Sequence, residues 1–137
     1  MFRKHLLMQI ACLILFSAGL FATPLKAGED GSSSSVLYYE ISPSLVANLA
    51  KGGKYIRCDV QLMTKDEDFL EQMRLHGPAI RHELLLLLSE QDGKVIKTSQ
   101  GKEQLRKQAL ESVSRVMKKI AGSDSVQALY FTTYYVK

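Results

Sequence analysis

Five consecutive leucines, Leu84 to Leu88, stand between charged residues in the stretch RHELLLLLSEQDGK, residues 81–94. The run is too short to cross a bilayer, which takes roughly 20 apolar residues. At about 100° per residue the five side chains go right round a helix, so that helix must be covered on more than one side. The run therefore predicts a helix in a layered domain that packs on a sheet through Ile80, Leu84, Leu87 and Leu88.

Leu85 and Leu86, in the middle of the run, point away from the sheet side of this helix. Two interpretations remain open for them. In the first, a neighbouring helix of the same domain covers both side chains and makes them part of the core. In the second, one of them packs against another subunit or a partner protein. Leu85 and Leu86 are therefore the candidate residues for partner binding or self-association.

Three stretches typical of β-strands precede this helix. Residues 36–41 and 44–49 are rich in apolar side chains and are separated by a Ser-Pro pair, and residues 55–63 alternate between apolar and polar side chains. Such alternation is typical of a strand with one buried face. The residues that it turns toward the core are Ile56, Cys58, Val60 and Leu62.

Helical spacing replaces the strand pattern from residue 65. Residues 65–76 open with acidic side chains, which suit a helix N-terminus, and the inward positions are Phe69, Leu70, Met73 and Leu75. The leucine-rich helix then runs from Pro78 to Ser89, because proline fits a first helical turn. After it, DGKVIKT predicts a turn and a short strand or extended link.

A long amphipathic helix follows and ends the helical part of the chain. Thr98 or Ser99 can cap its start, and Gly122 is a natural stop after Ala121. Its apolar line consists of Leu105, Ala109, Leu110, Val113, Val116, Met117 and Ile120. Residues 125–137 then read as a strand that is apolar or aromatic on both faces, so we expect it in the centre of the sheet.

The order of elements predicts an α+β domain with a small, mostly antiparallel sheet covered on one side by two to three helices. We place this domain at residues 36–137. A Ser/Gly-rich linker at residues 28–35 precedes it, and residues 1–27 form an N-terminal hydrophobic helix that is a signal or an anchor.

The N-terminal segment has the parts of an export signal. Arg3 and Lys4 precede an apolar stretch of 17 residues (6–22), and the positive-inside rule then puts the N-terminus in the cytoplasm and the domain outside. The apolar stretch is at the lower limit for a membrane span. Cleavage after Ala22 or Ala27 and retention as an anchor therefore both remain open.

The chain contains few residues that could support catalysis or metal binding. Its two cysteines are Cys12, in the leader, and Cys58, on a strand face that should be buried. His76 and His82 lie in charged helical surroundings without the spacing of a zinc or protease motif. The acids Asp66, Glu67, Asp68 and Glu71 fit a helix start better than a calcium loop. We expect no enzyme activity, no cofactor, no metal and no small-molecule substrate.

Nucleic-acid binding is not expected either. Beyond residue 27 the chain carries 15 basic and 14 acidic side chains, a net charge of +1. Nucleic-acid binding proteins need a concentrated basic face.

From Tyr39 to Lys137 the chain resembles the FliL family of flagellar basal-body proteins. The stretch RHELLLLLSEQDGKVIKTSQGKEQLR (81–106) is similar to a family pattern in which an R..LL.LLS helix is followed by a T.eGK..L helix start. GKYIRCDVQL, LVANL and the ending VQALYFTTYYVK resemble other strands of the family, and all four segments occur in the family's order.

The resemblance implies a single-pass inner-membrane protein whose periplasmic domain has a stomatin-type (SPFH-like) fold. It implies a site at the flagellar basal body, association with the stator, ring-like self-assembly, and support of flagellar rotation, swarming and chemotactic motility. It implies no cofactor and no reaction. The alternative is a soluble periplasmic binding or inhibitor domain released by cleavage after Ala27.

Overall fold

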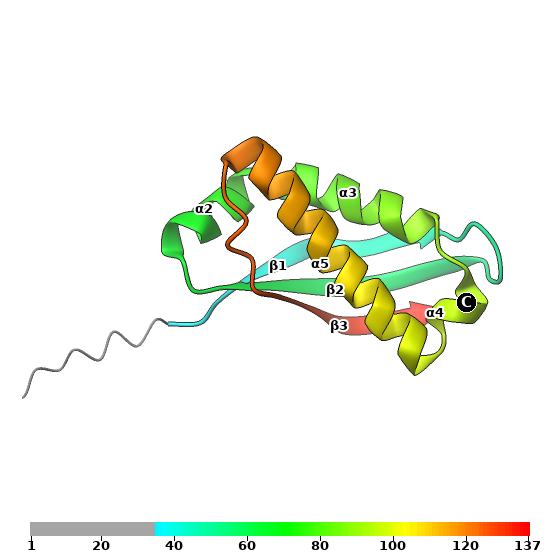
Figure 1. Cartoon of the computed structure of the whole chain (residues 1–137). Helices are drawn as coiled ribbons and strands as arrows, with labels where there is room; N and C mark the ends of the chain where they lie inside the picture. Colours follow the sequence, from blue (N-terminus) through cyan, green and yellow to red (C-terminus); the bar gives the residue numbers. More distant parts are fainter. Residues whose placement is uncertain (1–34) are drawn as a thin grey trace, which may run out of the picture. The chain divides into compact units, whose positions relative to one another are not determined.

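The computed structural model describes residues 35–137 (Figure 1). The expected signal or anchor helix (1–27) and nearly all of the expected linker lie outside the described residues. The described part is an α+β domain with a three-stranded antiparallel sheet in the order β1-β2-β3. The strands are β1 (Leu37–Asn48), β2 (Tyr55–Thr64) and β3 (Ala128–Val136).

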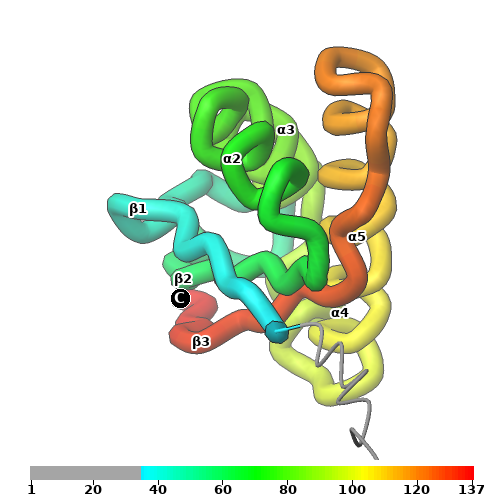
Figure 2. The backbone as a smooth tube through the Cα atoms, turned by 90° about the vertical axis from the view of Figure 1, so that its left-hand side faces the viewer, coloured from blue at the N-terminus to red at the C-terminus, as the bar shows by residue number. Residues whose placement is uncertain are grey.

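Four helices within residues 35–137 accompany the sheet, and α3 and α5 run side by side over one of its faces (Figures 1 and 2). Their bounds are α2 (Glu67–Leu75), α3 (Gly77–Ser89), α4 (Gly93–Ile96) and α5 (Ser99–Ala121). The expected small antiparallel sheet with a helical layer is thus confirmed.

The central strand β2 carries the core. Its alternation turns five side chains toward the helices, and each of them is fully buried. The five are Ile56, Cys58, Val60, Leu62 and Thr64. The helices add Ile80, Leu84 and Leu88 from α3 and Leu105, Val113 and Met117 from α5. The predicted inward face of 55–63 is therefore confirmed.

The opposite face of the sheet has no helix over it among the described residues (Figure 2). Large side chains are exposed there, namely Tyr38, Val46, Tyr130 and Tyr135. These exposed side chains explain why the expected place of residues 125–137 in the sheet was wrong. We expected 125–137 in the centre of the sheet because both faces are apolar or aromatic, but β3 is an edge strand and its outer row of tyrosines faces away from the core.

The two predicted strands 36–41 and 44–49 are a single strand, β1. Its pairing with β2 shifts register between Ile41 and Leu45, and the Ser42–Pro43 peptide bond within the shift is cis. A bulge on an edge strand is a position where proline is tolerated, because its missing N–H removes no ladder bond. The Ser-Pro pair therefore bends the strand without ending it.

Two smaller expectations also change. The link after α3 contains the one-turn helix α4 rather than a short strand, because the Asp92 side chain accepts a hydrogen bond from the Lys94 amide and caps it. Leu75, expected to face inward, is 68% exposed at the last position of α2. The acidic start expected for the first helix is confirmed, with Asp66 as the N-cap of α2. Of the two cap candidates for α5 the structure uses Thr98, and Gly122 ends the helix with a φ of 73°, as expected.

Candidate interaction site

The orientation of α3 on the sheet is set by apolar packing and by one arginine. Ile80, Leu84 and Leu88 are buried on the sheet side. Arg81 donates hydrogen bonds from its guanidinium to the carbonyl oxygens of Pro43 and Ser44, within the bulge of β1. These contacts determine which of the remaining leucines face outward.

The leucine run divides into buried and exposed members. Leu84 and Leu88 are each 1% exposed, whereas Leu86 is 48% exposed. Leu85 and Leu87 are partly buried and pack against the core cluster. Leu85 follows Arg81 by one helical turn and therefore lies on the β1 side of α3. The structure thus separates the two candidate residues, and only Leu86 presents a large apolar surface to solvent.

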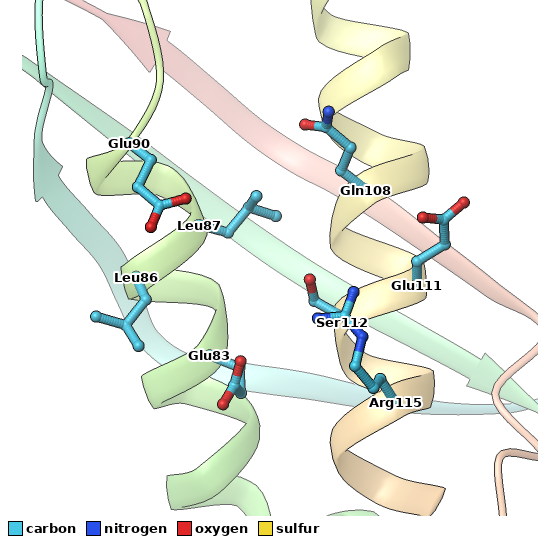
Figure 3. Close-up of a pocket in the computed structure, with 8 residues that line it drawn as sticks. All are labelled: Glu83, Leu86, Leu87, Glu90, Gln108, Glu111, Ser112 and Arg115. Atoms are coloured by element: carbon cyan, nitrogen blue, oxygen red, sulfur yellow. The ribbon is translucent and has the colours of Figure 1, made fainter.

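A groove lies between α3 and α5; Leu87 points into it, and Leu86 lines its outer edge with its side chain directed away from α5 (Figure 3). The groove has a volume of about 310 Å³. Its lining residues are Glu83, Leu86, Leu87 and Glu90 from α3, and Gln108, Glu111, Ser112 and Arg115 from α5. An adjoining hollow of about 250 Å³ shares Glu83, Ser112 and Arg115 with it and adds Val116, Lys119 and Ile120. The neighbouring helix α5 therefore flanks Leu86 without covering it.

The charges around the groove are distributed unevenly. Glu90 and Gln108 lie at one end, and Glu83 and Arg115 lie at the other, next to Lys119 (Figure 3). No ion pair within residues 35–137 joins these groups to one another. They remain available to charges of a bound protein, so the groove has a polar rim around Leu87.

Sequence reasoning missed most of this groove. Val116 and Ile120 were expected to face the core with the rest of the α5 stripe. Val116 packs against the core and also lines the adjoining hollow, whereas Ile120, in the last turn of α5, is 39% exposed.

The other sequence candidates have structural roles. Cys58 is fully buried in the sheet, and burial, followed by the charge of Asp59, raises the pKa of its thiol to about 12. Such a thiol stays protonated and unreactive at neutral pH. Asp66 accepts a hydrogen bond from the Phe69 amide at 3.0 Å, which is the helix-start role expected for this acidic cluster.

The described residues contain neither a cluster of metal ligands nor a membrane-spanning helix. In the part of the chain that the structure describes, no three His, Cys, Asp or Glu side chains come together as a metal site. No helix of residues 35–137 has both the length and the apolar character to span a bilayer. The apolar stretch 6–22 lies outside this range.

Two comparisons with known proteins bear on the domain. A family model described as "Flagellar basal body-associated protein FliL" matches residues 38–136. Flagellar protein FliL of Aquifex aeolicus (strain VF5) is 23% identical over 103 residues, which are 74% of this chain and 62% of that protein. The chain thus spans about three fifths of the relative's length. The family match runs from β1 to β3 and includes the whole α3–α5 groove.

Proposed function

This chain belongs to the FliL family of flagellar basal body-associated proteins, and from that premise we propose that it is a non-enzymatic motor accessory that associates with the stator. In this role it supports flagellar rotation, swarming and chemotactic motility. The family is one of flagellar accessory proteins and is not a known family of enzymes. The chemistry of the domain agrees with such a role, since its one described thiol is buried.

The exposure of Leu86 carries the proposal. A leucine that is 48% exposed at the edge of a groove loses hydration when a partner covers it, and burial of the remaining half contributes about 0.7–1.5 kcal/mol. A groove between two helices is suited to a third, amphipathic helix. The proposed occupant is a helix of a stator protein, with basic side chains toward Glu83 and Glu90 and acidic ones toward Arg115 and Lys119.

Ring-like self-association around the stator is the second part of the proposal. Leu85, partly buried beside β1, is the candidate residue for contact with a neighbouring copy. The domain is also expected to share the stomatin-type fold, which superposition on a solved stomatin domain would test.

The proposed location is the bacterial inner membrane, with the N-terminus in the cytoplasm and the domain in the periplasm at the flagellar basal body. Arg3 and Lys4 before the apolar stretch 6–22 support this orientation. N-terminal sequencing of the mature protein and membrane fractionation test it. A chain that begins near Gly28 in the soluble periplasmic fraction would instead favour the released binding or inhibitor domain.

The functional test replaces single leucines in a strain that lacks the chromosomal copy. Leu86→Ser should reduce co-purification with the stator and swimming in viscous medium, while filaments still assemble. Leu75→Ser is the matched control, because Leu75 is 68% exposed on α2 and lies outside the groove. Thermal unfolding of both variants should stay close to that of the unmodified chain.

Three outcomes count against the proposal. Unaltered motility of the deletion strain in viscous medium, together with no stator co-purification, contradicts the motor role. Equal loss of binding in Leu86→Ser and Leu75→Ser contradicts the groove. A monomeric chain in membranes that contain the stator contradicts the ring.

A further inference from the structure

The outer edge of β3 has no strand beside it in the described part of the chain. The sheet order places β2 on one side of β3 only, and no backbone bond from another strand within residues 35–137 reaches the other side. The strand sequence ALYFTTYYV contains neither proline nor a charged residue. Native proteins usually protect edges of this kind with charges, prolines or bulges, and of these β3 has only the bulge at Thr132. The opposite edge, on β1, carries Glu40, Pro43 and the anchor of Arg81.

The N-terminal half of β3 turns backbone groups away from β2. In an antiparallel ladder, alternate residues direct both backbone groups away from the neighbouring strand. Arg106 donates from Nη1 to the carbonyl oxygen of Leu129 at 3.4 Å, so this carbonyl faces α5 and not β2. This carbonyl is already bonded to Arg106, so the groups left for a further strand are the Leu129 amide and, by the alternation, the amide and carbonyl of Phe131. A register shift after Phe131, where Thr132 is the extra residue, ends this half.

A hollow of about 270 Å³ lies against the same half of the edge. Its lining residues are Ser99, Lys102, Glu103 and Arg106 from the first turns of α5, and Tyr130 and Phe131 from β3. The combination of an open strand edge and a helix beside it is the geometry by which domains bind extended peptides: the edge supplies main-chain hydrogen bonds and the hollow accepts a side chain.

The charge beside the hollow is basic. The charged residues that line it are Lys102 and Arg106, which are basic, and Glu103. Glu103 is occupied, because both of its oxygens accept hydrogen bonds from Arg106, at 2.6 and 2.7 Å. Lys102 lies over the ring of Tyr134, 4.7 Å from its centroid, and has no carboxylate within ion-pair distance among residues 35–137. The N-terminus of α5 adds partial positive charge at the same place.

We propose that the β3 edge binds an extended segment of another protein that carries a carboxylate. The segment adds a fourth strand beside Ala128–Phe131, places an apolar side chain in the hollow between β3 and α5, and directs an acidic side chain to Lys102. A second copy pairing through its own β3 fits less well, because that strand has no acidic residue. This surface shares no residue with the α3–α5 groove, so the inference does not depend on the proposed function.

The test uses the full chain, isotope-labelled and purified in detergent, with synthetic peptides as probes. The first peptide has about eight residues of alternating Val and Thr, long enough for a strand, with Glu at two Thr positions. The second has Gln in place of Glu. The third is the Glu peptide with alternate amides methylated, so that it cannot pair through one edge. Amide chemical shifts of Leu129 and Phe131 report binding.

The Glu peptide should bind saturably and shift these two amides, and the methylated peptide should not bind. The Gln peptide and the Lys102→Glu variant should each weaken binding about tenfold, because an opposed or absent charge at the rim removes one ion pair. Lys119→Glu, at the other end of the same helix, is the matched control and should bind normally. Leu86→Ser should also bind normally.

Other results would overturn the proposal. These are absence of saturable shifts at Leu129 and Phe131, equal binding of the methylated peptide, or equal weakening by Lys102→Glu and Lys119→Glu. Shifts of the same amides with protein concentration alone would assign the edge to a second copy. If the Glu peptide binds only after residues 28–34 are deleted, the chain's own linker is the segment that occupies the β3 edge. If Lys102→Glu fails to fold, the Gln and methylated peptides still decide the question on the unmodified chain.

Discussion

Arg81 on α3 donates from Nη2 to the carbonyl oxygen of Ser44 on β1 at 3.1 Å, and another nitrogen of the same guanidinium donates to the carbonyl of Pro43. Both carbonyls lie in the bulge where β1 loses register with β2. The arginine therefore replaces strand pairing at the point where the strand cannot supply it. It also sets the rotation of α3 and with it the exposure of Leu86.

Replacing Arg81 should destabilise the domain because two carbonyls lose their donor. We expect Arg81→Met to lower the free energy of unfolding by about 1–3 kcal/mol. Arg74→Met is the control, since Arg74 bonds only to Glu71 on its own exposed helix surface, and it should change stability by about 0.5 kcal/mol or less. Urea unfolding followed by circular dichroism measures both. Equal stability of the two variants would show that the bulge holds without the arginine.

Gly101 should tolerate no side chain. A Cβ at this position would overlap the carbonyl oxygen of Val95, in the short helix α4. We expect Gly101→Ala to cost about 1–3 kcal/mol or more, as overpacking does. At Gly122 nothing lies within 4 Å of such a Cβ, and the constraint there is the positive φ, which asparagine adopts readily. Gly122→Asn should therefore leave the melting temperature nearly unchanged, and an equal loss in the two variants would contradict the close approach of α4.

The loss of unfolding free energy on substitution of a leucine in the run should follow how deeply that leucine is buried. Leu84 is 1% exposed, and Leu84→Ala should cost about 2–5 kcal/mol because it leaves a cavity. Leu86→Ala should cost about 0.5 kcal/mol or less, as for an exposed site, and Leu85→Ala should fall between them. Chemical unfolding of the three variants checks the order. A large loss for Leu86→Ala would place this side chain in the core.

The free energy of unfolding should decrease at alkaline pH because the Cys58 thiol is buried. Burial raises the pKa of this thiol from 9.0 to about 12, so above pH 9 the unfolded chain loses a proton that the folded chain retains. The free energy of unfolding should then decrease between pH 9 and pH 12, with a slope of up to about 1.4 kcal/mol per pH unit from this group.

The Cys58→Ala variant isolates this contribution. It removes the titrating thiol while Tyr134, whose pKa burial also raises to about 12, remains in both proteins. The two pH profiles, measured in a Cys12→Ser background, should diverge above pH 9. Parallel profiles, or rapid alkylation of Cys58 in the native chain at pH 8, would show that the thiol is not buried as described.

The FliL-like pattern in residues 81–106 has a structural explanation. Arg81 anchors α3 to β1, Leu84 and Leu88 fill the core, and the Thr98 hydroxyl accepts a hydrogen bond from the Gly101 amide at 3.0 Å. These are local or short-range requirements, which is why they can be recognised in a sequence. They describe how the domain is held together and say nothing about what it binds.

Local residue patterns suffice to predict the alternation of β2, the three longer helices, the acidic start of α2, and the ends of α5 at Thr98 and Gly122. Each depends on residues within a few positions of one another. The tertiary structure decided that β1 continues through Pro43, that β3 is an edge strand, and that Leu86 is exposed while Leu84 is not. Those outcomes depend on how many strands and helices are available to cover each face. Apolar character alone cannot distinguish a side chain covered by its own domain from one left for a partner.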